Sequence, residues 1–123
     1  MKYCSDFRYD LEVGKIGEKL LHQILHSEKI EVKRDSWIYR SGNIAIEFES
    51  RGKPSGIAKS IATWWAIILS GEYEDKYIIL ISSDKLKEIA RIYYKKGNIK
   101  EMGDDNTSKS VLIPLNEFFL YES

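Results

Sequence analysis

Three carboxylates, Asp35, Glu47 and Glu49, are the residues of this chain whose spacing most directly suggests chemistry. Glu47 and Glu49 are one residue apart in a segment of β character, so both are expected on one face of a strand. Like charges that face each other destabilise a sheet unless a cation lies between them. Carboxylate oxygens suit Mg²⁺ and Mn²⁺, and such an ion can assist attack on a phosphate. The spacing therefore predicts a divalent-metal site.

Basic and hydroxyl side chains follow directly after these carboxylates. Arg51, Lys53 and Lys59 come first, and Thr63 comes shortly after them. Such groups hold the phosphate oxygens of nucleic acids. A simple Gly/Pro loop is the alternative for residues 51–56, and Thr63 could instead bond a backbone carbonyl of its own helix. An acidic cluster beside a basic loop predicts a metal-dependent phosphodiesterase.

Three short segments of β character are expected to position the carboxylates: residues 29–33, 36–40 and 43–50. A tight turn would join the last two segments into a hairpin. With that turn, Asp35 lies at the start of the second segment and comes opposite Glu47. The sequence therefore predicts a three-stranded meander whose hairpin brings the acidic residues together.

Helices are expected on both sides of this meander. Residues 12–27 repeat apolar side chains at helical spacing, and Asp10 is a suitable N-cap. Residues 58–70 are apolar almost all round, so as a helix they should be buried on more than one side. Trp64 and Trp65 in this segment favour core or interface packing over stacking on bases. We therefore expect a homodimer formed through the apolar helix 58–70, which would bring two sites to the two strands of a duplex.

The second half of the chain predicts a further set of elements. A continuous β-type run is typical of a strand in the middle of a covered sheet, and Ser82 or Ser83 could cap the amphipathic segment after it. Asp104 and Asp105 lie in a turn-prone stretch. In order, the expectations are a strand at 76–82, a helix at 84–94, a loop at 103–108, a short strand at 111–115 and a final helical turn.

The composition is that of one folded domain covering residues 1–123, with 43% hydrophobic and 31% charged residues. The formal net charge is zero, so binding to a polyanion depends on a local patch. The single cysteine, Cys4, leaves no internal disulfide and fits a reducing compartment. We expect no targeting segment and no membrane-spanning helix, because the longest apolar run is far shorter than about 20 residues. The expected location is the cytoplasm, with no membrane partner.

The expected fold class is α/β (α+β), with a mixed sheet flanked by helices in the order α-β-β-β-α-β. This order resembles the core of the PD-(D/E)XK nuclease superfamily, the restriction-endonuclease-like fold. In that pattern an Asp opens the second strand, an acidic residue, one spacer and a Lys follow on the third, and a Glu often comes from the first helix. Asp35, Glu47 and Glu18 match these positions. The stretch IEFESRGKPSGI followed by TWW looks like a small single-domain group of phages, archaeal viruses and mobile elements.

This resemblance implies a viral protein acting in the host-cell cytoplasm as a Mg²⁺- or Mn²⁺-dependent DNA endonuclease. Glu18, Asp35 and Glu47 would hold the metal. The DNA would be held mainly through its phosphates, and the residues expected to contact them are Arg51, Lys53, Lys59 and Thr63.

One position departs from the superfamily pattern, because Glu49 stands where the motif has Lys. A glutamate there could accept a proton as general base or bind a second metal. Alternatively, Lys53 could reach back into the site as a substitute lysine, or catalysis could be lost. The catalytic set implied by the resemblance is therefore Asp35, Glu47, Glu49 and Lys53.

Two other kinds of protein remain open. One is a catalytically inactive nuclease-fold protein that binds DNA as an accessory factor of a virus or mobile element. The other is an interaction protein that docks a partner through the apolar segment 58–70. His22 and His26 have the spacing of a helical zinc pair, but without an evident third ligand a solvated helix face is the better account.

Overall fold

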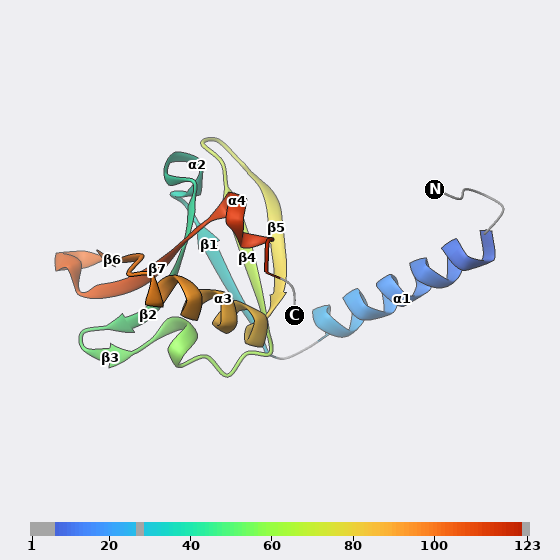
Figure 1. Cartoon of the computed structure of the whole chain (residues 1–123). Coiled ribbons are helices and arrows are strands. Elements are labelled where there is room, and N and C mark those ends of the chain that lie inside the picture. The colour runs from blue at the N-terminus through green and yellow to red at the C-terminus, as the bar shows by residue number, and fades with distance from the viewer. Residues whose placement is uncertain (1–6, 27–28, 122–123) are drawn as a thin grey trace.

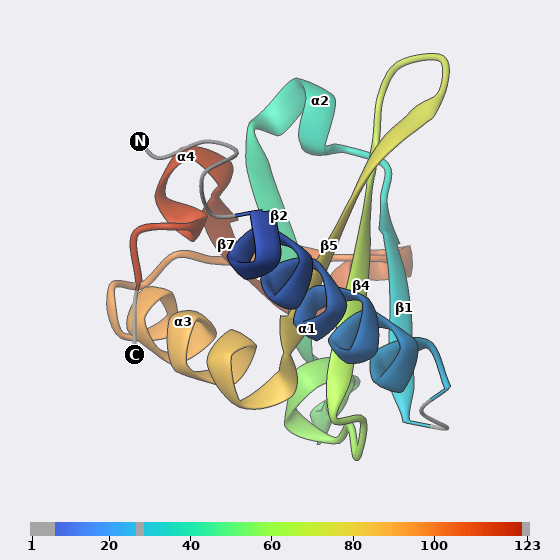
Figure 2. The ribbon, with the colours of Figure 1, turned by 90° about the vertical axis from the view of Figure 1, so that its right-hand side faces the viewer.

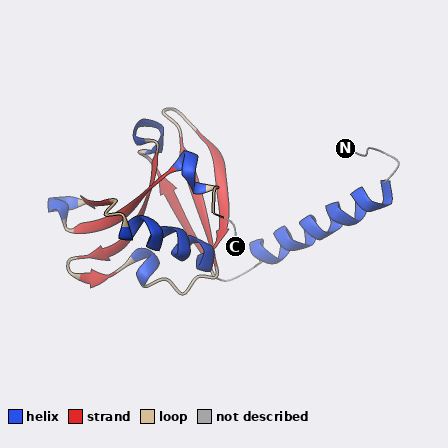
Figure 3. Cartoon of the chain, in the orientation of Figure 1, coloured by secondary structure: helices blue, strands red, loops and turns tan. Residues whose placement is uncertain are grey.

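The strands of the protein form two sheets, with a long N-terminal helix projecting to one side (Figure 1, Figure 3). The computed structural model describes residues 7–26 and 29–121, so the predictions for Cys4 and Ser27 lie outside the described residues. Helices are present, together with one mixed sheet and one antiparallel sheet. The predicted α+β class is therefore confirmed.

Sheet A is a three-stranded mixed sheet in the order β1-β4-β5. It contains β1 (Ile30–Asp35), β4 (Trp64–Ser70) and β5 (Asp75–Ser82). β1 runs parallel to β4, and β4 runs antiparallel to β5. β4 is therefore the central strand, and its two neighbours are edge strands.

Sheet B is antiparallel and four-stranded, in the order β3-β2-β7-β6. Its strands are β2 (Asn43–Ser50), β3 (Lys53–Pro54), β6 (Ile99–Met102) and β7 (Ser108–Pro114). One face of β2 and β7 is apolar and fully buried, which is the alternation expected of a sheet covered on one side. The buried side chains on this face are Ile44, Ile46, Val111 and Ile113.

The helix α3 (Ser83–Lys95) covers this buried face and also reaches sheet A, because it packs against β7, β4 and β5. Its N-terminus is capped by Ser82, whose Oγ accepts a hydrogen bond from the Lys85 N–H at 3.2 Å. Of the two caps predicted, Ser82 and Ser83, the structure has Ser82. The core joins α3 to the inner face of sheet A through Trp65, Ile67 and Leu69.

The other helical segments are short, apart from α1 (Phe7–Leu25). α4 (Leu115–Phe118) follows β7 directly and confirms the predicted final helical turn. The Tyr93 hydroxyl on α3 donates to Glu117 Oε1 at 2.8 Å, which ties α4 to the core. The remaining segments are α2 (Ile38–Ser41), η2 (Gly56–Ala58) and η3 (Asp104–Asn106).

The predicted strand at 36–40 and its hairpin with 43–50 are wrong. Instead, the chain turns after Asp35 and forms α2, which ends at Gly42 in the left-handed conformation, φ 72°. The Asp35 carboxylate accepts hydrogen bonds from the backbone at the start of this turn, and an aspartate that bonds nearby N–H groups favours a turn over a continuing strand. The segment after the turn is then free to join another sheet.

The predicted helix at 58–70 is also wrong, because this segment holds the end of η2, an irregular stretch and the strand β4. β4 is apolar on both faces and only seven residues long. A continuous apolar run has no period-two pattern, so periodicity alone cannot separate a strand inside a sheet from a buried helix. A docking helix at 58–70, as proposed for the homodimer and for the interaction protein, does not exist.

Three smaller predictions also need correction. The strand predicted at 76–82 is present as β5, but it is an edge strand with an exposed first half and not a central one. The stretch 103–108 holds η3 and the first residue of β7, which extends the predicted strand at its start, while β6 was not predicted. α1 already includes Asp10, so this residue lies inside the helix and does not precede it.

No helix within residues 7–26 and 29–121 has the length and apolar content that a membrane crossing requires.

Candidate active-site cavity

A cavity of about 550 Å³ lies where the end of β1 meets the polar face of sheet B. Asp35 and Glu47 both line it, although they belong to different sheets. The two carboxylates are thus brought together as the sequence predicted, but not across a hairpin. Polar side chains of both sheets also line the cavity, among them Lys33, Lys100, Ser108 and Ser110.

The Asp35 carboxylate is held by three backbone N–H groups. Oδ1 accepts from Trp37 and Ile38, each at 3.1 Å, and Oδ2 accepts from Ala45 at 3.0 Å. The bonds to Trp37 and Ile38 fix the turn into α2, and the bond to Ala45 joins the end of sheet A to β2 in sheet B. A carboxylate offers about four lone-pair positions, so Asp35 retains one for a further ligand.

Glu47 lies two residues after Ala45 on β2, which is one pleat repeat or about 7 Å along the strand. It shares the cavity face with Ser110 of β7 and Lys100 of β6, because the strand register places the three residues in one cross-strand row. Glu47 is half-buried, and none of the described residues gives its carboxylate a hydrogen bond or an ion pair.

The backbone at Glu47 is fixed from behind by η2. A Cβ atom added to Gly56 would lie 2.1 Å from the carbonyl oxygen of Glu47, and Gly56 has φ +51°. Only glycine fits both this close approach and this conformation. Gly56, at the end of the loop GKPSG, therefore packs directly on the backbone of the strand that carries Glu47. We call this contact the clamp; the prediction of a simple Gly/Pro loop did not include it.

Glu49 does not share the face of Glu47. The register shifts between these two residues, so that Glu47 faces Ser110 but Glu49 faces Lys109. Such a bulge adds one residue to the strand and reverses the direction in which the following side chains point. Glu49 instead forms an ion pair with Lys109, 3.4 Å from Oε2 to Nζ. The prediction of one face for both glutamates is therefore wrong.

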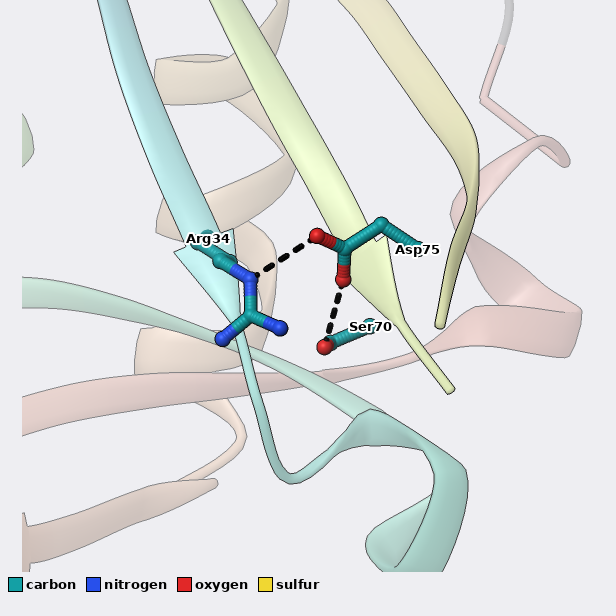
Figure 4. Close-up of polar contacts among 3 residues, drawn as sticks. All are labelled: Arg34, Ser70 and Asp75. Atoms are coloured by element: carbon teal, nitrogen blue, oxygen red, sulfur yellow. Dashed lines mark hydrogen bonds and ion pairs between the residues drawn. The ribbon is translucent and has the colours of Figure 1, made fainter. Parts of the chain in front are cut away.

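The cationic residues that line the cavity are Lys33, Arg34 and Lys100, and of these only the two lysines have no ion-pair partner among the described residues. Lys33 lies two residues before Asp35 on β1, so strand alternation alone gives it the same face. The guanidinium of Arg34, by contrast, is engaged elsewhere. Its Nε donates to Asp75 Oδ2 at 3.0 Å, and the Ser70 hydroxyl donates to Asp75 Oδ1 at 2.6 Å (Figure 4).

This interaction links the three strands of sheet A near one end. The hydrogen bond from Arg34 is the main cause that lowers the pKa of Asp75, and the Ser70 hydroxyl lowers it further. The same hydrogen bond raises the pKa of Arg34. Both groups therefore stay charged and paired at neutral pH.

The remaining predicted site residues lie outside the lining of the cavity. Glu18 is exposed on α1, Lys53 is exposed on β3, and Arg51 occupies the turn between β2 and β3. Lys59 follows η2, and the Thr63 backbone N–H and hydroxyl both donate to the Lys29 carbonyl, at 2.9 and 3.4 Å. The predicted phosphate contacts are thus not gathered around the two carboxylates.

Within residues 7–26 and 29–121, no group of three or more His, Cys, Asp and Glu is placed to hold a metal ion. The three-carboxylate set expected from Glu18, Asp35 and Glu47 is therefore not assembled. Two carboxylates nevertheless fit magnesium, which keeps several waters and uses one or two protein carboxylates together with substrate phosphate. Asp35, through its remaining lone pair, and Glu47 are the residues that would hold such an ion.

His22 and His26, which have the spacing of a helical zinc pair, contact each other. His26 Nδ1 lies 2.8 Å from the His22 carbonyl oxygen, and the two rings lie 3.9 Å apart at their centroids. Asp104 and Asp105 belong to η3, where the Asp104 carbonyl accepts from Thr107, as expected of a turn.

No known family model, curated protein or solved structure matches this chain. The likeness to the nuclease superfamily therefore depends on the residues quoted from the sequence.

Proposed function

We propose that the protein is a metal-dependent DNA endonuclease of the PD-(D/E)XK type, with its site in the cavity between β1 and sheet B. The observation that supports this most directly is the meeting of Asp35 and Glu47 in one cavity with Lys33 and Lys100. These are two of the acidic residues of the superfamily pattern together with the cationic groups that a phosphodiester requires.

Each side chain has a separate role in this proposal. Asp35 and Glu47 hold Mg²⁺ or Mn²⁺, and when bound such an ion supplies Lewis acidity for phosphodiester hydrolysis. Lys33 and Lys100 hold the oxygens of the phosphate under attack, and one of them replaces the motif lysine that Glu49 does not supply. Neither lysine has an ion-pair partner among the described residues, so both heads are available to an anion.

The test is cleavage of supercoiled, linear, single-stranded and four-way-junction DNA with Mg²⁺ or Mn²⁺. Glu47→Gln should lower cleavage at least about 100-fold, because it removes a metal-binding charge while keeping the shape of the side chain. Glu49→Gln is the matched control, since it makes the same change two residues away on the opposite face. Equal loss in both variants, or unchanged cleavage in Glu47→Gln, would refute the assigned site.

A second candidate is an inactive nuclease-fold protein that binds DNA through the same cavity. It is favoured by the Asp35 carboxylate, three of whose acceptor positions are taken by backbone N–H groups. This candidate predicts no cleavage with any metal, salt-sensitive DNA binding that a chelator leaves unchanged, and weaker binding in the double variant Lys33→Met, Lys100→Met. The variant Lys53→Met, outside the cavity, is its control.

A further inference from the structure

The helix α1 carries an apolar stripe that the rest of the chain leaves largely exposed. Ile16 is 67% exposed and Leu25 is 62% exposed, and among the described side chains of α1, residues 11–25, only Ile24 is buried. Figure 1 shows α1 projecting away from the two sheets. An amphipathic helix gains most of its stability by burying its apolar face. We name as the helix stripe the residues Val13, Ile16, Leu20, Leu21 and Leu25.

Two glycines lie on the same side of α1. At 100° per residue, Gly14 and Gly17 fall within the arc of the helix stripe. A glycine inside a helix is less favourable than alanine, and a Cβ added at either position would meet nothing within 4 Å. Nothing within the described part of the chain requires glycine at these positions. Close approach of a second surface would require it.

Sheet A presents an apolar face to the same side of the molecule. Strand alternation gives this outer face to residues whose neighbours on the inner face form the core. Val32 on β1 is 58% exposed and Ile78 on β5 is 63% exposed, although both lie in the middle of their strands, whereas Ala66 on the central strand β4 is 9% exposed. We name as the outer face the residues Ile30, Val32, Trp64, Ala66, Ile68, Ile78 and Leu80.

The helix stripe and the outer face are alike in chemistry and comparable in length. The stripe runs from Val13 to Leu25, about 18 Å along α1, and the outer face runs from Trp64 to Ile68, about 13 Å along β4. Figure 2 shows α1 on the side of sheet A, and Figure 1 shows that it points outward and does not lie flat on its own sheet. In the sequence, α1 ends only five residues before β1 begins, so an exchange of α1 between copies would keep the two sheets of the dimer close together.

We propose that the helix stripe of one copy packs on the outer face of sheet A of a second copy, in a reciprocal exchange that forms a two-fold dimer. Each copy supplies one helix stripe and one outer face. The two equivalent contacts of the dimer therefore bury both apolar surfaces of both chains. The cavity with Asp35 and Glu47 adjoins the opposite face of sheet A, so this dimer leaves it open and does not depend on its function.

The test compares the mass in solution of the wild type with that of two double variants. The helix variant is Ile16→Glu, Leu20→Glu, and the sheet variant is Val32→Glu, Ile78→Glu. The wild type should have twice the chain mass of 14.3 kDa, and each variant should be a monomer, with dimerisation weakened at least about 100-fold. Ile61→Glu is the control, because Ile61 is 84% exposed but lies outside both surfaces, and it should remain dimeric.

Mixing the two variants distinguishes exchange from the alternatives. The sheet variant retains an intact helix stripe and the helix variant retains an intact outer face, so the mixture should form a heterodimer through one of the two contacts. A wild-type monomer would overturn the proposal and would favour packing of α1 on its own sheet. A dimeric wild type whose two variants stay monomeric when mixed would overturn the helix-on-sheet contact. A sheet variant that still dimerises would overturn it in favour of helix-on-helix association. Circular dichroism checks the fold, and Val32→Ser, Ile78→Ser replaces the sheet variant if that variant does not fold.

Discussion

The two faces of sheet A are built from the same three strands but differ in what covers them. The inner face is packed: Trp65 and Ile67 are 1% exposed, and Asp35 at its end is fixed by three hydrogen bonds. The outer face is also apolar, but its side chains on the two edge strands, Val32 and Ile78, are open to solvent. Hydrophobicity alone therefore does not tell which side of a strand is the core. The packed side holds the polar cavity, and the open side has the character of an interface.

The largest loss is expected from Gly56→Ala, which acts on Glu47 of β2 in the cavity next to the packed side. The new Cβ would collide with the carbonyl of Glu47, and alanine would be strained at φ +51°, so we expect a loss of about 4 kcal/mol in the free energy of unfolding. Gly42→Ala is the control, because Gly42 also has positive φ but open space around it, and it should lose only about 1 kcal/mol. Urea denaturation measures both. Similar losses in the two variants would contradict the proposed clamp.

Truncating one buried and one exposed side chain tests the difference between the two faces of sheet A. Ile67→Ala removes a buried side chain and should cost about 3 kcal/mol at any protein concentration. Val32→Ala should cost less than about 1 kcal/mol when the protein is dilute, because Val32 is exposed in a single chain. If a second copy covers the outer face, the cost of Val32→Ala should rise with protein concentration. Thermal denaturation over a range of concentrations measures the difference, and equal costs on the two faces in dilute protein would remove the distinction.

The hydrogen bonds of the Asp35 carboxylate connect the two sheets, and replacing Asp35 tests how much this connection stabilises the fold. Asp35→Ala leaves the N–H groups of Trp37, Ile38 and Ala45 without their acceptor, so we expect a loss of about 2 kcal/mol in the free energy of unfolding. Asp35→Asn keeps one oxygen acceptor and should lose less. Because of this structural role, lost cleavage in Asp35→Ala does not by itself identify a metal ligand, and Glu47→Gln is the cleaner variant. An Asp35→Ala protein as stable as the wild type would show that these hydrogen bonds do not contribute to the free energy of unfolding.

The smallest effect is expected on the open side, from the pairing of Asp75 with Arg34. This pairing lowers the pKa of Asp75 in the folded state below its value in the unfolded chain, about 4. Its contribution to stability is therefore present above about pH 4 and is lost as the pH falls through the folded-state pKa. Asp75→Asn should make the loss of stability below pH 4 slightly shallower and leave the rest of the profile unchanged. Identical acid profiles for the variant and the wild type would show that the pair contributes nothing measurable.

Elements whose signals are local were predicted from the sequence. The helix α3 follows from its amphipathic spacing and its serine cap, and the buried face of β2 follows from alternation. The closeness of Asp35 and Glu47 was also predicted, but on the basis of a hairpin that does not exist. Lys33 could have been found, because it alternates with Asp35 on one strand. Lys100 could not, because no signal marked β6 as a strand.

Tertiary structure decided the rest, for identifiable physical reasons. The segment 64–70 is apolar on both sides, so only its position between β1 and β5 makes it a strand. Glu49 was separated from Glu47 by a bulge, which depends on the pairing with β7 and leaves no mark in the residue pattern. The sequence by itself determined which side chains are apolar, charged or able to cap and turn the chain. Which of them meet is set by strand register and sheet partners, because those contacts join residues far apart in the chain.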